Sequence, residues 1–152
     1  AILWLTLFRD KIDDIMEQVK CPVAVFVNRG YREGALVSFV LGGMIDIFLL
    51  SYISIMLQNG HSVRLFLFDT DDEEFCRCMN DLQARYSGQI TIVRFAGVEE
   101  LVTREKDGLL VMSHLSYTKL SEDELVMREL SSLLVIRRNK NKGEKNERLE
   151  IG

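Results

Sequence analysis

Residues 35–57, ALVSFVLGGMIDIFLLSYISIML, form a long apolar run with one residue that is charged at neutral pH, Asp46. A run of about 20 apolar residues is long enough to cross a bilayer, so it is either a membrane-spanning helix or part of a water-soluble core. The pair Gly42 and Gly43 divides the run, and the residues before it are rich in Val and Phe, which favour a strand. This pattern predicts a strand, a tight turn and then a buried helix.

The flanks of the run also favour a core element. A spanning helix usually has Trp or Tyr at its ends and Lys or Arg on its cytoplasmic side, whereas this run passes through QNGH into another apolar strand. In its helical part, polar residues share an arc with Asp46 and leave a broad apolar face. The polar arc contains Ser51, Ser54 and Gln58, and the apolar face contains Ile47, Leu50, Ile53 and Leu57. We therefore expect no membrane-spanning segment in this chain.

Composition excludes several classes of function. The chain has 152 residues, enough for one domain that folds without disulfides or metals, and its formal net charge of −4 argues against nucleic-acid binding. Its three cysteines are an odd number with no export signal ahead of them, which favours a reduced intracellular compartment. Cys76 and Cys78 lie two residues apart and point to different faces of a helix, so we expect no metal site. We also expect no cofactor.

Strand-like and helix-like segments alternate along the chain, which is typical of an α/β fold with an open, mainly parallel sheet and helices on both faces. The expected strands are residues 1–7, 22–28, 35–41, 62–68, 89–95, 108–114 and 132–137. The expected helices include residues 9–20, with Ile12, Ile15, Met16 and Val19 on one face, and residues 122–130, started by a capping box of Ser121 and Glu124. The acidic residues Asp69, Asp71 and Asp72 are expected to cap the helix that follows them.

The order of these segments divides the chain into three parts. Residues 35–138 form a complete unit of five strands, and residues 1–30 form a partial repeat, strand-helix-strand, that packs on it. Residues 9–30 of the partial repeat and residues 122–139 share one plan, an acidic helix, a break and a Val-rich strand that ends in Arg. Residues 139–152 are expected to be a disordered polar tail. The chain opens on Ala1, which is explained either by removal of an initiator Met or by excision from a longer protein.

Two short stretches resemble a known family. CPVAVFVNRGY at 21–31 is similar to the segment before the second universal stress protein-like repeat in the cytosolic tails of monovalent cation/proton antiporters, although Asn28 stands where the family usually has Asp. Gly42, Gly43 and Asp46 also fit the family, whereas its second acidic position and its arginine-rich helix are absent. The matching residues of the first stretch are Cys21, Pro22, Val23, Val25, Val27, Arg29 and Gly30.

The resemblance implies a fold and a cellular location. It implies a universal stress protein-like strand order, 3-2-1-4-5, with N-terminal β-α-β elements that extend the sheet. It also implies a cytosolic regulatory domain on the cytoplasmic face of the inner membrane, the soluble part of a membrane protein. The partner would be the membrane transporter domain of the same full-length protein.

The sequence also points to one candidate binding site. In an open parallel sheet, ligands bind at the carboxyl ends of the strands where the strand order reverses. The tentative ligand-binding residues there are Gly42, Gly43, Asp46, Ser113, His114 and Ser116. In an alternative interpretation, the two glycines only make a tight turn and His114 is a solvated loop residue. The glycine motif that binds phosphates in nucleotide-binding stress proteins is absent, because no glycine lies between Gly108 and Gly143.

No arrangement of catalytic residues is legible, so we expect no enzyme. The first hypothesis is a non-catalytic regulatory and assembly domain of a cation/proton antiporter, present as a homodimer or a pseudo-dimer. In a pseudo-dimer, residues 22–28 pair with residues 132–137 of the same chain, as the last strands of single-domain stress proteins pair across a dimer. The alternative is a sensor that binds an adenine nucleotide or a cyclic dinucleotide in the strand-end crevice.

Overall fold

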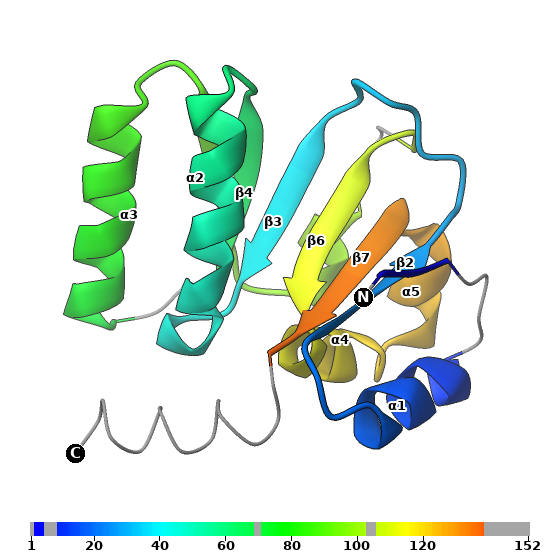
Figure 1. Cartoon of the computed structure of the whole chain (residues 1–152). Coiled ribbons are helices and arrows are strands. Elements are labelled where there is room, and N and C mark those ends of the chain that lie inside the picture. The colour runs from blue at the N-terminus through cyan, green and yellow to red at the C-terminus, as the bar shows by residue number, and fades with distance from the viewer. Residues whose placement is uncertain (1, 5–8, 69–70, 103–105, 139–152) are drawn as a thin grey trace.

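The structure, a computed structural model, describes residues 2–4, 9–68, 71–102 and 106–138, and in these ranges seven strands form one sheet (Figure 1). The strands are β1 (Ile2–Trp4), β2 (Val23–Val27), β3 (Val37–Leu41), β4 (Val63–Phe68), β5 (Ile90–Phe95), β6 (Leu109–Ser113) and β7 (Ser132–Arg137). The helices are α1 (Arg9–Gln18), α2 (Leu50–Gln58), α3 (Glu73–Arg85), α4 (His114–Leu120) and α5 (Glu124–Glu129), with two short 3-10 helices, η1 (Met44–Leu49) and η2 (Val98–Leu101). The tail expected at 139–152 lies outside the described residues.

The sheet is mainly parallel and has the order β1-β2-β7-β6-β3-β4-β5. Strands β3 to β7 are parallel to one another, and β1 is parallel to β2. Among the strands that the structure describes, only β2 and β7 pair in an antiparallel way. The prediction of an α/β fold with an open, mainly parallel sheet is therefore confirmed.

Helices cover both faces of the sheet because side chains alternate along each strand (Figure 1). Helices α2 and α3 pack on one face, where Phe39 and Leu41 of β3 point. Helices α1, α4 and α5 pack on the other face, where Val40 of β3 points. All five residues of β3 are buried, as expected for a central strand covered on both sides. The apolar character of residues 35–41 is thus explained by the sheet.

The second half of the apolar run forms η1 and then α2, and Ile53 and Leu57 of α2 are buried against the sheet. In the described part of the chain, no helix combines the length and the apolar character needed to cross a bilayer. Asp46 does not lie on the polar arc expected from helical spacing, because its side chain is only 1 % exposed. The first turn is a 3-10 helix with about three residues per turn, so the α-helical spacing does not extend back to Asp46.

Strands β2 and β7 lie side by side, as the pseudo-dimer hypothesis predicts. The antiparallel register is centred on Val25, which pairs with Val135. On either side of this junction, a helix and a further parallel strand follow the same plan: α1 and β1 beside β2, and α5 and β6 beside β7. Strands β1 and β2 therefore extend the sheet beyond β7, across an antiparallel junction.

Two predictions about helix starts differ in outcome. The side chain of Asp72 accepts a hydrogen bond from the backbone N–H of Phe75, so Asp72 caps α3 as expected, whereas Asp69 lies outside the described residues. The capping box of Ser121 and Glu124 is wrong. Helix α5 is capped by Asp123, which accepts from the N–H of Val126, because Ser121 already belongs to the end of α4 and its hydroxyl donates to Thr118.

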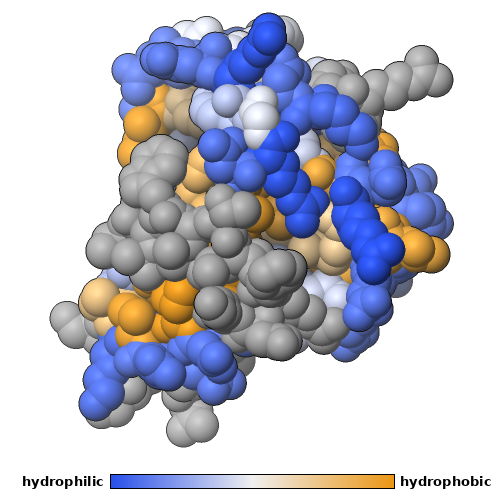
Figure 2. All heavy atoms as spheres, turned by 90° about the vertical axis from the view of Figure 1, so that its right-hand side faces the viewer, coloured by the Kyte–Doolittle hydropathy of each residue, from blue (hydrophilic) through white to orange (hydrophobic). Residues whose placement is uncertain are grey.

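In the coloured part of Figure 2, hydrophilic side chains predominate, and hydrophobic side chains are exposed in smaller groups between them. Over the described residues, six large hydrophobic side chains are more than 40 % exposed. They are Ile45, Tyr52, Ile55, Phe68, Leu115 and Leu125. Single exposed hydrophobic residues are ordinary on a protein surface, but three of these six belong to one pocket.

Candidate functional site

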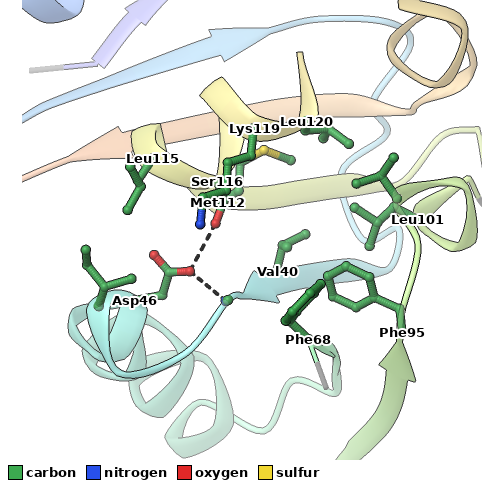
Figure 3. Close-up of a pocket in the computed structure, with 13 residues that line it drawn as sticks. Val40, Asp46, Phe68, Phe95, Leu101, Met112, Leu115, Ser116, Lys119 and Leu120 are labelled. Atoms are coloured by element: carbon green, nitrogen blue, oxygen red, sulfur yellow. Dashed lines mark hydrogen bonds between the residues drawn. The ribbon is translucent and has the colours of Figure 1, made fainter. Parts of the chain in front are cut away.

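A pocket of about 220 Å³ lies at the carboxyl ends of β3 and β6 (Figure 3). It forms on the face covered by α4, between that helix and the 3-10 helix η2 that follows β5. A strand-end crevice between β3 and β6 is where the sequence predicts a small ligand to bind. The lining residues are Val40, Gly42, Ile45, Asp46, Phe68, Phe95, Val98, Leu101, Met112, Leu115, Ser116, Lys119 and Leu120.

Asp46 is the buried polar centre of this pocket. Its Oδ2 accepts a hydrogen bond of 2.7 Å from the backbone N–H of Gly42 and one of 3.0 Å from the hydroxyl of Ser116 (Figure 3). One carboxylate oxygen thus joins the turn after β3 to the first turn of α4. Hydrogen bonds to a charged acceptor are stronger than neutral ones, so this link fixes the position of the carboxylate.

The local sequence explains how Asp46 reaches this place. Gly43 has φ of +143°, a conformation that residues with a side chain rarely adopt, and it turns the chain sharply after β3. The N–H of Asp46 then donates to the carbonyl oxygen of Gly43 at 3.0 Å, which closes the first turn of η1. The side chain of Asp46 is thereby brought back to Gly42.

The second carboxylate oxygen of Asp46 has a different environment. Oδ1 is buried and has no hydrogen-bond partner among the described residues. Figure 3 shows this oxygen on the Leu115 side of the carboxylate, without a dashed line. A buried acceptor without a donor is costly, and native proteins rarely leave one. Oδ1 is therefore a buried, unfilled acceptor at the wall of the pocket.

The walls of the pocket are mostly apolar. Phe68 and Phe95 come from the ends of β4 and β5, and their rings meet edge to face with centroids 5.5 Å apart. Met112 of β6 and Leu120 of α4 are almost completely buried. Such a hollow, with a few convergent polar groups, is the usual composition of a small-molecule site.

Lys119 provides the second charge of the site. It lies on α4, one turn after Ser116, and lines the same pocket while its side chain remains exposed. The pocket therefore combines a buried carboxylate with an exposed ammonium group at its edge. Solvent screens the exposed charge much more than the buried one.

The structure brings together three of the six predicted site residues: Gly42, Asp46 and Ser116 line the pocket. Gly43 shapes the turn beside it. Ser113 instead caps α4, since its hydroxyl oxygen accepts a hydrogen bond of 3.1 Å from the N–H of Ser116.

His114 is neither in the pocket nor in a loop. It begins α4, and its Nε2 lies 3.0 Å from Oδ1 of Asp13 on α1. Its ring also stacks on that of Tyr117. His114 therefore connects the main unit to the partial repeat.

Sequence reasoning did not find the aromatic wall or the lysine of the pocket. Phe68 and Phe95 end two apolar strands and looked like ordinary core residues. Lys119 belongs to α4, which we did not predict, although Ser113 as a cap and the apolar pair Tyr117 and Leu120 at helical spacing were available signals.

Near the pocket, Glu100 stabilises η2. Its Oε2 accepts hydrogen bonds from the N–H of Ala96 at 2.7 Å and from the N–H of Gly97 at 3.1 Å. These bonds from the backbone, with that from Gly97 contributing most, lower the pKa of the Glu100 carboxyl from its usual value. This contact holds the segment that carries Val98 and Leu101 at the pocket.

A second polar arrangement lies at the junction of β2 and β7. The guanidinium of Arg29, after β2, donates to the carbonyl oxygens of Met127 and Leu130 at the end of α5, the latter at 3.1 Å. Burial lowers the pKa of this guanidinium, and its electrostatic interaction with Tyr117 acts in the opposite direction.

The guanidinium of Arg137, at the end of β7, donates to the carbonyl oxygens of Val19 and Cys21 after α1, the latter at 2.8 Å. Each half of the junction thus binds the helix end of the other half. The acceptors are backbone carbonyl groups, which are present whatever side chains these positions carry.

The groups that line the pocket are suited to holding a small ligand and to fixing the turn after β3 against α4. Among the residues that the structure describes, no three His, Cys, Asp or Glu side chains gather in a way that suits a metal ion. The pocket offers one buried acceptor and an apolar hollow. No protein-family model matches the chain, and no curated protein is significantly similar to it.

Proposed function

We propose that this chain is a universal stress protein-like, non-catalytic regulatory and assembly domain of a monovalent cation/proton antiporter. It acts on the cytoplasmic face of the inner membrane, and its partner is the membrane transporter domain of the same full-length protein. The observation that carries the proposal is the antiparallel pairing of β2 with β7 within one chain. The assignment to an antiporter rests on the sequence resemblance at 21–31 and 42–46.

The strand order supports the stress protein-like part of this proposal. Numbered from β3, the five parallel strands lie in the order 3-2-1-4-5, read from β5 to β7. This is the order implied by the resemblance, with β1 and β2 added at the edge of the fifth strand.

The junction supports the assembly part. A strand at the edge of a sheet presents unpaired backbone groups and invites pairing with another chain. Here β2 covers the edge of β7, and Arg29 and Arg137 fasten the two halves from opposite sides. The pair of half-units therefore replaces an interface that two separate copies would otherwise make, which is a pseudo-dimer.

The test uses the full-length protein that carries this chain, reconstituted into liposomes with a pH-sensitive dye inside. Addition of K⁺ or Na⁺ should drive proton flux. The double variant Arg29→Met/Arg137→Met should change the rate or its pH dependence several-fold, whereas Arg85→Met, an exposed arginine on α3, should leave both unchanged. Absence of cation-driven flux contradicts the antiporter assignment, and identical flux in all variants contradicts the regulatory role.

A second proposed function is that of a small-ligand sensor, which binds an adenine nucleotide or a cyclic dinucleotide. One specific observation favours it, the unfilled Oδ1 of Asp46 at the strand-end pocket. A thermal-shift panel of these compounds tests it, since a ligand at a hundred times its Kd adds about 2.7 kcal/mol of stability. No shift with any of these compounds would remove nucleotides as ligands.

A further inference from the structure

We infer that the pocket binds a small organic cation, an amidinium or ammonium group carried on a single apolar ring, with Asp46 as its anchor. This inference rests on the second function proposed above in one respect, that a small ligand binds in this pocket. It goes beyond that function because it replaces nucleotides, whose phosphates carry negative charge, by a ligand of the opposite sign.

The first step concerns charge. Asp46 is 1 % exposed, and its two hydrogen bonds both go to Oδ2, from the N–H of Gly42 and the hydroxyl of Ser116. Oδ1 is buried without a donor among the described residues. A group that brings both a hydrogen atom and a positive charge would satisfy it best, because a charge-assisted hydrogen bond is roughly twice as strong as a neutral one.

The second step concerns shape and polarity. A cavity of about 150 Å³ lined by apolar side chains holds one benzene ring, so about 220 Å³ accommodates a single ring with a small substituent. The walls of the pocket are aliphatic and aromatic, and Figure 3 shows the rings of Phe68 and Phe95 across the pocket from Asp46. Aromatic faces attract cations as well as apolar groups.

The third step concerns anions. Lys119 is the cationic residue among those that line the pocket; its side chain is exposed, and Figure 3 shows its nitrogen on the side of Ser116 and Asp46. An anionic ligand held by Lys119 would place its charge next to the buried carboxylate of Asp46, which forms no ion pair among the described residues. A cation at Oδ1 avoids this repulsion and is opposed only by a screened charge.

The test compares three probes of nearly the same shape: benzamidine, which is a cation, benzamide, which is neutral, and benzoate, which is an anion. Binding is followed by NMR chemical shifts of the backbone amides of Gly42 and Ser116 in the wild-type chain, which needs no variant. We expect benzamidine to bind at least tenfold more tightly than the other two. Tighter binding of benzamide or benzoate would overturn the cation inference and leave the sensor function standing. Binding of none of the three would overturn the cation inference, and the thermal-shift panel of nucleotides decides the sensor function separately.

Two variants locate the effect. Asp46→Asn keeps the size of the side chain but presents an N–H₂ group where Oδ1 was, so benzamidine should lose at least tenfold in affinity and its preference over benzamide should disappear. Lys119→Met removes the opposing charge at the edge, so benzamidine should bind about twofold more tightly. An unchanged benzamidine affinity in a folded Asp46→Asn chain, or a weaker one in Lys119→Met, would contradict the proposal.

Discussion

Arg29 and Arg137 make reciprocal contacts across the antiparallel pair β2 and β7. Arg29 follows β2 and binds the carbonyl oxygen of Leu130 at 3.1 Å, and Arg137 ends β7 and binds that of Cys21 at 2.8 Å. Each guanidinium thus satisfies carbonyl oxygens at the end of the helix that precedes the other strand. Carbonyl groups at helix ends have no donor within the helix. The two guanidinium groups therefore supply hydrogen bonds that these carbonyl oxygens would otherwise accept from water.

Breaking this reciprocal contact should weaken the whole fold. We expect Arg29→Met and Arg137→Met each to lower the free energy of unfolding by about 1 kcal/mol, a value discounted for the partial exposure of both side chains. Urea denaturation followed by circular dichroism measures the change. The free energy of unfolding of Arg29→Lys should lie between those of Arg29→Met and the wild type, because lysine keeps the positive charge but lacks the planar set of N–H donors. Wild-type stability in the double variant would show that the contacts contribute nothing.

Removal of the Asp46 side chain by Asp46→Ala should lower stability more than removal of its charge by Asp46→Asn. In Asp46→Ala, the N–H of Gly42 and the hydroxyl of Ser116 lose their acceptor, and we expect a loss of about 1–3 kcal/mol. In Asp46→Asn, the amide oxygen can still accept both bonds and the buried charge is removed, so stability should equal or exceed that of the wild type. Thermal unfolding of the two variants gives the comparison. Equal losses in both would mean that the charge itself stabilises the fold.

Gly42 should be intolerant of a side chain although its backbone is unstrained. A Cβ atom there would lie 3.2 Å from Oδ2 of Asp46 and 3.6 Å from Oγ of Ser116. We expect Gly42→Ala to displace the carboxylate, with a loss of about 1 kcal/mol and shifted NMR signals of Ser116. In Gly43→Ala the Cβ meets nothing within 4 Å, so any loss there comes from the positive φ and should leave the Ser116 signals in place. Unshifted Ser116 signals in Gly42→Ala would contradict this account of the pocket.

The backbone amides of Ala96 and Gly97 should report the ionisation of Glu100. Because the folded state lowers the pKa of this carboxyl from 4.5, its contribution to stability is complete above about pH 4.5 and is lost as the pH falls through the lower, folded value. NMR titration of the two amides should therefore give a midpoint below 4.5. The titration should vanish in Glu100→Gln. A midpoint at or above 4.5 would refute the assigned hydrogen bonds.

Much of the fold follows from patterns that are strong in the sequence. Continuous apolar runs predicted the strands β3 and β4. The pairing of β2 with β7 was predicted from the resemblance to single-domain stress proteins, whose last strands pair across a dimer, and the register of Val25 with Val135 agrees with it. Arg29 and Arg137 belonged to the plan shared by residues 9–30 and 122–139, but their partners are backbone carbonyls, which leave no signature in a sequence.

The pocket was predictable in position but not in composition. The carboxyl ends of β3 and β6 identified Gly42 and Ser116. Asp46 was placed on a polar arc because α-helical spacing was applied to a turn that is a 3-10 helix. Phe68 and Lys119 come from β4 and α4, so their meeting depends on tertiary packing that spacing along the chain does not encode.

The central claim is that β2 of one chain covers the edge of β7 of the same chain. It is tested most directly by NMR on an equal mixture of isotope-labelled and unlabelled protein, with cross-strand NOEs between Val25 and Val135 as the observable. We predict that these NOEs arise within single molecules and that no NOE connects labelled with unlabelled chains across this junction. Intermolecular NOEs from β7 to β7, or from β2 to β7 of another copy, would show that the interface joins separate molecules and would contradict the pseudo-dimer.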